Sequence, residues 1–181
     1  MRKVFFFCLA SMLCLVANAQ TFIGNHPLQL SATGTVSQTT LNSDHVVSSL
    51  TMSNHTWEIL FKTETLKFGA NATQLQVLNN VFSLPSNRLM KLTIDVQSAN
   101  FNFSNNLSVQ NLPLAGQLHY NNQVAPVPVT LNLSYNKATN EFTYTFSGNV
   151  NLTNVGLSAA NASADFNDNV TISGGGSLTK R

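Results

Sequence analysis

Charged side chains are scarce in this chain of 181 residues, because Asp, Glu, Lys and Arg together make up only 9% of it. Cysteine is scarcer still, and its two copies, Cys8 and Cys14, both lie close to the N-terminus. Beyond that region the sequence offers no disulfide and no thiol chemistry. With no thiol and few carboxylates, nucleophilic and acid–base catalysis have little to work with, so we expect a protein that is not an enzyme.

Metal-binding motifs are missing as well. The chain has four histidines, His26, His45, His55 and His119. They form no H-x-H or H-E-x-x-H motif. The best metal-ligand candidates are the dipeptides Asp44-His45 and Asn54-His55, which would have to meet from neighbouring loops. Such dipeptides are more commonly part of turns, so we expect no metal and no cofactor.

The N-terminus has the features of a secretory signal peptide. Arg2 and Lys3 precede an apolar run at residues 4–16, and Ala17-Asn18-Ala19 is an A-x-A cleavage motif. The apolar run is too short to span a bilayer. We therefore expect a signal peptide at residues 1–19 and one domain at residues 20–181, in a protein that is periplasmic or secreted.

Loss of the signal peptide changes the charge balance. Without Arg2 and Lys3, seven of the nine basic residues remain and face seven acidic ones, so the mature chain is formally neutral. The basic isoelectric point of the full sequence is therefore no argument for binding nucleic acid or an anionic membrane surface.

Bulky apolar residues alternate with polar ones from residue 112 to residue 152, interrupted by turn signals at Asn121-Asn122 and at residues 136–140. A period of two is typical of a β-sheet with one apolar and one polar face. Shorter stretches of the same kind occur at residues 28–32, 46–52, 57–61, 90–96 and 170–178. These patterns predict an antiparallel all-β protein of eight or nine strands, and closure into a barrel would remove the exposed edges.

Two irregular places interrupt the alternation. Leu75, Leu78, Val81 and Phe82 have a spacing that favours a short helix ending before Pro85, with a strand as the alternative. Further along, the residues expected to face inward change from odd-numbered ones, such as Val109, to even-numbered ones, such as Leu112. This change predicts a β-bulge near Asn111.

Within this pattern the sequence resembles the YceI-like family. The likeness lies in LAGQLHYNNQVAPVPVTLNLSY, EFTYTFSGNVNLTNVGL and the closing strand NVTISGGGSL. The family's positions there coincide with Gly116, Pro126, Val127, Pro128, Val129, Gly148, Val150, Leu152 and Gly156. Upstream, WEILFKTETLKF and LNNVFSLPSNRLMKLTID are similar to the family's strand, short helix and strand. The neutral QLQVLNNVF departs from it, since the family is rich in Arg, Asp and His there.

The resemblance implies an eight-stranded antiparallel lipocalin-like barrel with one short helix, which binds a polyisoprenoid or similar apolar chain in its interior. An eight-stranded barrel is just wide enough to be filled by side chains or to hold one small ligand. Parity predicts the inward residues that would line such a pocket or fill an ordinary core: Trp57, Ile59, Phe61, Met90, Leu92, Ile94, Phe101, Phe103, Leu131, Leu133, Tyr135, Phe142, Tyr144 and Phe146.

Two other architectures fit the same alternation. A secreted β-sandwich with a filled core would bind partners through its loops, for example at residues 42–56 and 121–126. An outer-membrane barrel is disfavoured, since it needs girdles of aromatic residues and this chain has one Trp and three Tyr.

Overall fold

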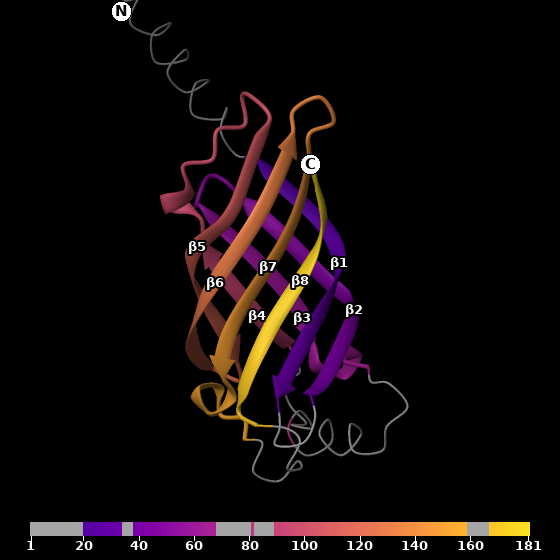
Figure 1. Cartoon of the computed structure of the whole chain (residues 1–181), viewed down its shortest axis with the longest axis vertical. Coiled ribbons are helices and arrows are strands. Elements are labelled where there is room, and N and C mark those ends of the chain that lie inside the picture. The colour runs from indigo at the N-terminus through magenta and orange to yellow at the C-terminus, as the bar shows by residue number, and fades with distance from the viewer. Residues whose placement is uncertain (1–19, 34–37, 68–80, 82–88, 159–166) are drawn as a thin grey trace, which may run out of the picture.

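Eight antiparallel strands pair in sequence order, and the last pairs with the first, so the sheet closes into a barrel (Figure 1). The structure is a computed structural model that describes residues 20–33, 38–67, 81, 89–158 and 167–181. The strands are β1 (Thr21–Thr33), β2 (Gln38–Thr51), β3 (Thr56–Lys62), β4 (Leu89–Asp95), β5 (Leu107–Tyr120), β6 (Gln123–Asn136), β7 (Glu141–Asn151) and β8 (Asn169–Lys180). Three short 3-10 turns, η1 (Thr63–Thr65), η2 (Gln97–Ala99) and η3 (Leu152–Val155), complete the described elements.

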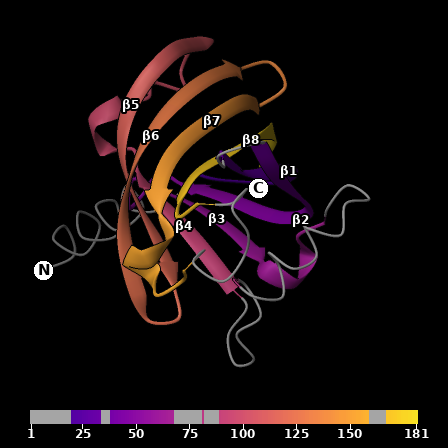
Figure 2. The same ribbon diagram turned by 60° about the horizontal axis from the view of Figure 1, so that its bottom comes forward.

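The closed ring confirms the predicted all-β barrel and shows that the sandwich alternative is wrong (Figure 2). Its physical basis is visible on β7, where Phe142, Tyr144 and Phe146 are buried while Thr143 and Thr145 are exposed. One face of every strand points into the ring, so the alternation in the sequence becomes an apolar interior and a polar exterior.

The strands at the N-terminal side are longer than the sequence indicates. β1 begins at Thr21 rather than near Leu28, and β2 begins at Gln38 rather than at Val46. The β1 extension has its two bulky residues, Phe22 and Ile23, side by side, and the β2 extension is mostly polar, so bulky residues do not mark the alternation there. Pairing between β1 and β2 nevertheless continues from Thr21↔Thr51 to Thr33↔Gln38.

The predicted bulge and hairpin are both confirmed. Pairing between β5 and β6 shifts between Val109 and Leu112, and Asn111 takes a φ of 53°. The backbone N–H of Asn111 donates to Asn132 Oδ1 at 2.8 Å. At the β5–β6 hairpin, Asn121 and Asn122 have φ of 47° and 62°, the left-handed values that a two-residue type I′ turn requires.

Two expectations fall outside the described residues. These are the signal peptide at residues 1–19 and nearly all of the expected helix at residues 75–82. Of that helix only Val81 is described, and it is helical and buried. No helix in the described part of the chain is long and apolar enough to cross a membrane.

Candidate functional site

The barrel interior collects the residues that the alternation assigns to it. Twelve of the fourteen predicted lining residues lie on strands and are buried, with at most 4% of each side chain exposed. The exceptions are Phe101 and Phe103, which are half-buried and lie on the segment between η2 and β5. Burial places these side chains inside the barrel; that they line a ligand pocket stays a prediction.

Aromatic rings concentrate at one end of this interior. We call it the aromatic end, and it carries the β2–β3 turn at residues 52–55 and the β6–β7 turn at residues 137–140. Phe142 is its centre, with ring centroids 4.4 Å from Phe22, 4.8 Å from Tyr135 and 5.0 Å from Phe103. The Phe22 and Phe103 contacts are edge-to-face, an arrangement that rings favour because their edges are positive and their faces negative.

The opposite end, beside the β5–β6 turn and η3, is built mainly from aliphatic side chains. We call it the aliphatic end, although Phe61 and Tyr120 are also buried there. Its buried aliphatic residues include Leu28, Leu30, Leu41, Val46, Met90, Leu118, Val127, Val150 and Ile172. Contacts between such side chains have no preferred geometry, in contrast to the ring contacts at the aromatic end.

Buried polar side chains lie next to the aromatic end, one inward-facing position further along β7 than Phe142. We call His26, Ser48, Trp57 and Tyr144 the interior polar cluster; each is at most 4% exposed. Trp57 Nε1 donates to Ser48 Oγ at 2.6 Å, and the rings of Trp57 and Tyr144 are 4.4 Å apart. The His26 ring lies edge-on to Tyr144 with centroids 5.3 Å apart.

The hydrogen bond of His26 fixes the state of its ring. Nδ1 lies 2.9 Å from the carbonyl oxygen of Pro27, which can only accept, so Nδ1 carries the proton and donates. In the neutral ring Nε2 is then an acceptor, and no partner bonds to it. Burial lowers the pKa of His26, an effect that the hydrogen bond to Pro27 opposes only in part, so the ring favours the neutral form.

Tyr144 is protonated for a related reason. Burial raises the pKa of its hydroxyl strongly, and the nearby Ser48 hydroxyl offsets only part of that rise. No hydrogen bond of standard geometry to the Tyr144 hydroxyl is formed within the described part of the chain, although the Ser48 hydroxyl lies near enough to lower its pKa.

Glycines on β8 provide the space for these rings. Gly176 pairs with Tyr144 across the β7–β8 ladder, and a Cβ on it would lie 2.6 Å from His26 Cβ. A Cβ on Gly174 would lie 2.9 Å from the ring of Phe146. The glycine run in the sequence therefore marks close approach by neighbouring side chains.

His26 and Ser48 were not among the residues that the sequence assigned to the site. The alternation along each strand could have identified them. His26 lies two residues before Leu28, and Ser48 two before Leu50, so each shares the face of a buried leucine. A polar residue on the apolar face of a strand breaks the alternation and therefore indicates a candidate site residue.

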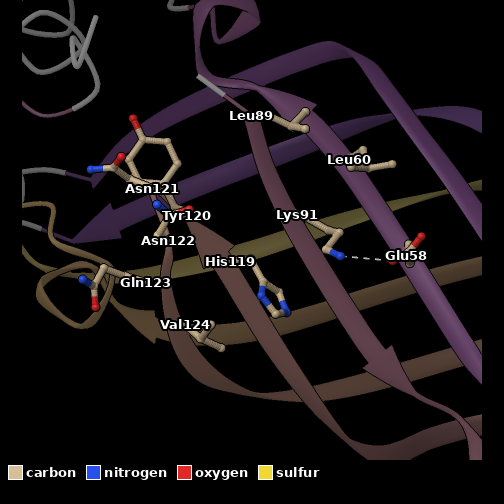
Figure 3. A pocket seen from close by; sticks show the side chains of 10 residues that line it. All are labelled: Glu58, Leu60, Leu89, Lys91, His119, Tyr120, Asn121, Asn122, Gln123 and Val124. Atoms are coloured by element: carbon tan, nitrogen blue, oxygen red, sulfur yellow. Dashed lines mark hydrogen bonds and ion pairs between the residues drawn. The ribbon is translucent and has the colours of Figure 1, made fainter. Parts of the chain in front are cut away.

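A pocket of about 500 Å³ lies on the outside of the barrel, across β3, β4 and the β5–β6 hairpin (Figure 3). In its lining Lys91 Nζ lies 3.3 Å from Glu58 Oε1, and His119 is another lining residue. Desolvation lowers the pKa of His119, Lys91 lowers it further and Glu58 opposes both. His119 is on the polar face of β5 and is half-buried.

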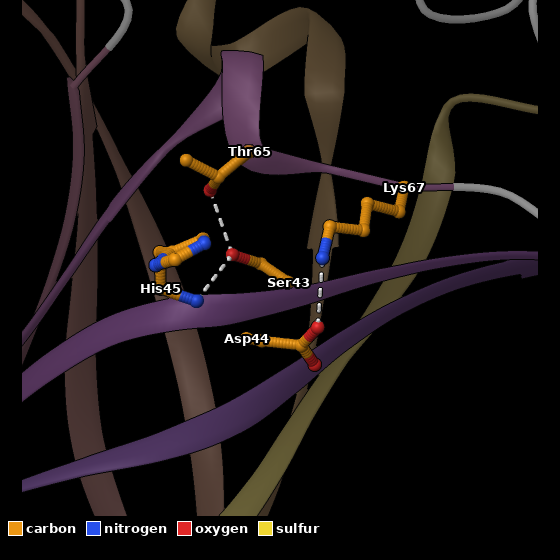
Figure 4. A network of polar contacts seen from close by, with 5 residues as sticks. All are labelled: Ser43, Asp44, His45, Thr65 and Lys67. Carbon is orange, nitrogen blue, oxygen red and sulfur yellow. Dashed lines mark hydrogen bonds and ion pairs between the residues drawn. The ribbon is translucent and has the colours of Figure 1, made fainter.

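The proposed metal-ligand dipeptides are not brought together as the sequence hypothesis requires. Asp44 and His45 lie within β2, not in a loop, and Asp44 Oδ2 accepts from Lys67 Nζ at 3.0 Å (Figure 4). Ser43 and Thr65 share a hydrogen bond of 2.7 Å, so this network fastens η1 and the residues after it to β2. In the described ranges no three or more His, Cys, Asp or Glu residues form a group that could hold a metal.

Comparison with known proteins finds similarity in structure alone. No family model and no curated protein matches the sequence. A polyisoprenoid-binding domain from Saccharophagus degradans, implicated in plant cell wall breakdown, superposes with a TM-score of 0.68 at 10% identity, over 90% of this chain and 99% of that one. Burkholderia cenocepacia BcnA gives 0.59 at 12% identity, over 85% and 96%. The expected likeness to the YceI-like family is thus confirmed in the fold.

Proposed function

We propose that this protein is exported and holds one long apolar chain molecule, such as a polyisoprenoid, inside its barrel without altering it chemically. The observation that carries the proposal is a closed barrel with an almost wholly apolar interior. In the described part of the chain, the buried polar side chains other than Tyr and Trp are His26, Ser43, Ser48 and Thr63. The polyisoprenoid-binding domain with the same fold supports the choice of ligand.

Apolar burial supplies the binding free energy. Each methylene group transferred from water to such an interior contributes about 0.8 kcal/mol, so a long chain is retained without any charged contact. Catalysis usually combines several acids, bases or nucleophiles, and in the described interior no Asp, Glu, Lys or Arg side chain is buried. This favours binding over chemical conversion.

The aromatic end offers an entry route. Phe101 and Phe103 approach the interior from the connection between η2 and β5, not from a strand. Their side chains can therefore move without breaking the hydrogen-bond ladder of the barrel. A rim pocket of about 540 Å³ lies beside both of them and also includes Gln20, Met52 and His55.

The polar outer face of the barrel supports an exported protein whose outer surface is in contact with water. On β6 and β7 the outward residues include Thr130, Asn132, Thr143, Thr145 and Ser147. A barrel embedded in a bilayer turns an apolar band outward, which is the opposite arrangement.

Native mass spectrometry tests the proposal. The mature protein, purified from its own host without detergent, should carry a stoichiometric extra mass that organic solvent extracts as a lipid. Protein without that mass should take up an added polyprenol at one molecule per chain. A bare mass together with no uptake of polyprenol would contradict the proposal.

A further inference from the structure

The interior polar cluster contains two buried polar atoms that have no hydrogen-bond partner in the described part of the chain. His26 Nε2 and the Tyr144 hydroxyl both lack a hydrogen-bond partner, although the two residues are only 3% and 4% exposed. A buried polar atom without a partner is destabilising, so natural proteins rarely keep one without a reason. Here two such atoms belong to side chains whose rings are in contact, with centroids 5.3 Å apart.

The two atoms also have complementary hydrogen-bonding roles. His26 Nε2 is an acceptor, because Nδ1 carries the proton and donates to the carbonyl of Pro27. The Tyr144 hydroxyl keeps its proton and is a donor. They form no hydrogen bond with each other. A hydroxyl group has the matching roles, because it donates through its hydrogen to an acceptor such as His26 Nε2 and accepts through its oxygen from a donor such as Tyr144.

Unpaired hydroxyls elsewhere do not share this arrangement. Thr93 lies on the outer face of β4, and Thr63 lies in η1 beside the aliphatic end. The two side chains of the polar cluster, by contrast, are both buried within the barrel interior and their rings are in contact.

Charge decides which kind of head group fits. Every lysine or arginine whose side chain is described lies outside the barrel, and Lys91, the least exposed of them, remains 38% accessible. A phosphate or carboxylate placed beside His26 would therefore be buried without a cation, at a large cost in desolvation. A neutral alcohol avoids that cost.

We propose that the polar cluster recognises the hydroxyl of a long-chain alcohol, with His26 Nε2 accepting from it and Tyr144 donating to it. The alcohol's chain then extends into the aliphatic end. This inference rests on the proposed function and adds the head-group class: an unphosphorylated prenol or a similar apolar alcohol.

The test compares three ligands with the same chain: geranylgeraniol, geranylgeranyl monophosphate and the parent hydrocarbon. Binding to the full mature protein is measured by native mass spectrometry and by competition. The alcohol should bind at least about tenfold more tightly than either of the others. His26→Phe and Tyr144→Phe each remove one polar atom, and both should reduce that preference about tenfold while changing hydrocarbon affinity by less than about twofold. Thr145→Val, on the outer face beside Tyr144, is the matched control and should keep the preference.

Each contrary result has a distinct meaning. If alcohol and hydrocarbon bind the wild-type protein equally, or if the phosphate binds most tightly, the head-group inference is wrong while the proposed function stands. If the preference for the alcohol is unchanged in both variants, the head-group inference is also wrong, because other groups then bind the hydroxyl. If none of the three ligands binds, the proposed function fails and the inference with it. The wild-type series is informative even if a variant does not fold.

Discussion

The two ends of the barrel interior are built from different chemistry. At the aromatic end, Phe22, Tyr135 and Phe142 form a set of directional ring contacts, and the unpaired atoms of His26 and Tyr144 lie next to it. The aliphatic end is formed mainly by Leu, Val, Ile and Met side chains. Rings and polar atoms can orient a ligand, whereas aliphatic side chains only exclude water from it. The contrast indicates that a ligand would lie in one direction, with its polar group toward the aromatic end.

The largest expected effect on stability comes from placing a charge on the inward face of β7, compared with the same charge on its outward face. Tyr144→Arg buries a guanidinium without a partner and should cost several kcal/mol, enough to abolish folding or ligand retention. Thr145→Arg places the same group on the exposed face and should change the free energy of unfolding by less than about 0.5 kcal/mol. Circular dichroism and urea unfolding measure both. Equal tolerance of the two changes would mean that inside and outside are wrongly assigned.

A second pair of variants compares the two ends directly. Phe142→Ala should lower the free energy of unfolding by about 3–5 kcal/mol, because it leaves a cavity and removes several ring contacts. Leu118→Ala, fully buried at the aliphatic end, should cost less within its usual range of about 2–5 kcal/mol. Urea unfolding curves give both values. A larger loss at Leu118 would show that the ring contacts add nothing to stability.

His26 should make the aromatic end sensitive to acid. Its pKa in the folded protein is lowered from the ordinary 6.5, so below that pH the unfolded chain binds more protons than the folded one. Its contribution to stability is therefore complete above pH 6.5 and decreases as the pH falls toward the folded-state pKa. The wild type should lose more stability than His26→Phe between about pH 7.5 and pH 5. Identical pH profiles for the two proteins would contradict this assignment.

The smallest effect is expected at the outer surface beside the aliphatic end. Lys67→Ala removes the exposed ion pair with Asp44 and should cost at most about 1 kcal/mol. Lys180→Ala, at an exposed lysine that forms no ion pair within the described part of the chain, provides the control. Salt should reduce the difference between the two variants, which thermal unfolding at low and high ionic strength would detect. A cost of several kcal/mol would show that the ion pair between Lys67, just after η1, and Asp44 of β2 contributes much more to stability than an exposed pair normally does.

The sequence predicts the strands, the bulge and the barrel because all three follow from local patterns. Parity assigns Phe142 and Tyr144 to the interior, and the change of parity at Asn111 gives the bulge. The contrast between the two ends does not follow in this way, since it depends on which side chains from distant parts of the sequence, such as Phe22 of β1 and Phe142 of β7, meet inside the closed barrel. Gly176 shows the limit, because only the paired strands reveal that it makes room for His26.

Fluorescence of Trp57 tests the central claim most directly. Trp57 is the only tryptophan of the chain, is fully buried, and belongs to the polar cluster. A long-chain alcohol that carries bromine next to its hydroxyl should quench Trp57 saturably at one ligand per chain, and the same alcohol brominated at the far end of its chain should quench less. Equal quenching by the two would contradict a single orientation. No quenching by either, with binding established independently, would place the ligand outside the barrel.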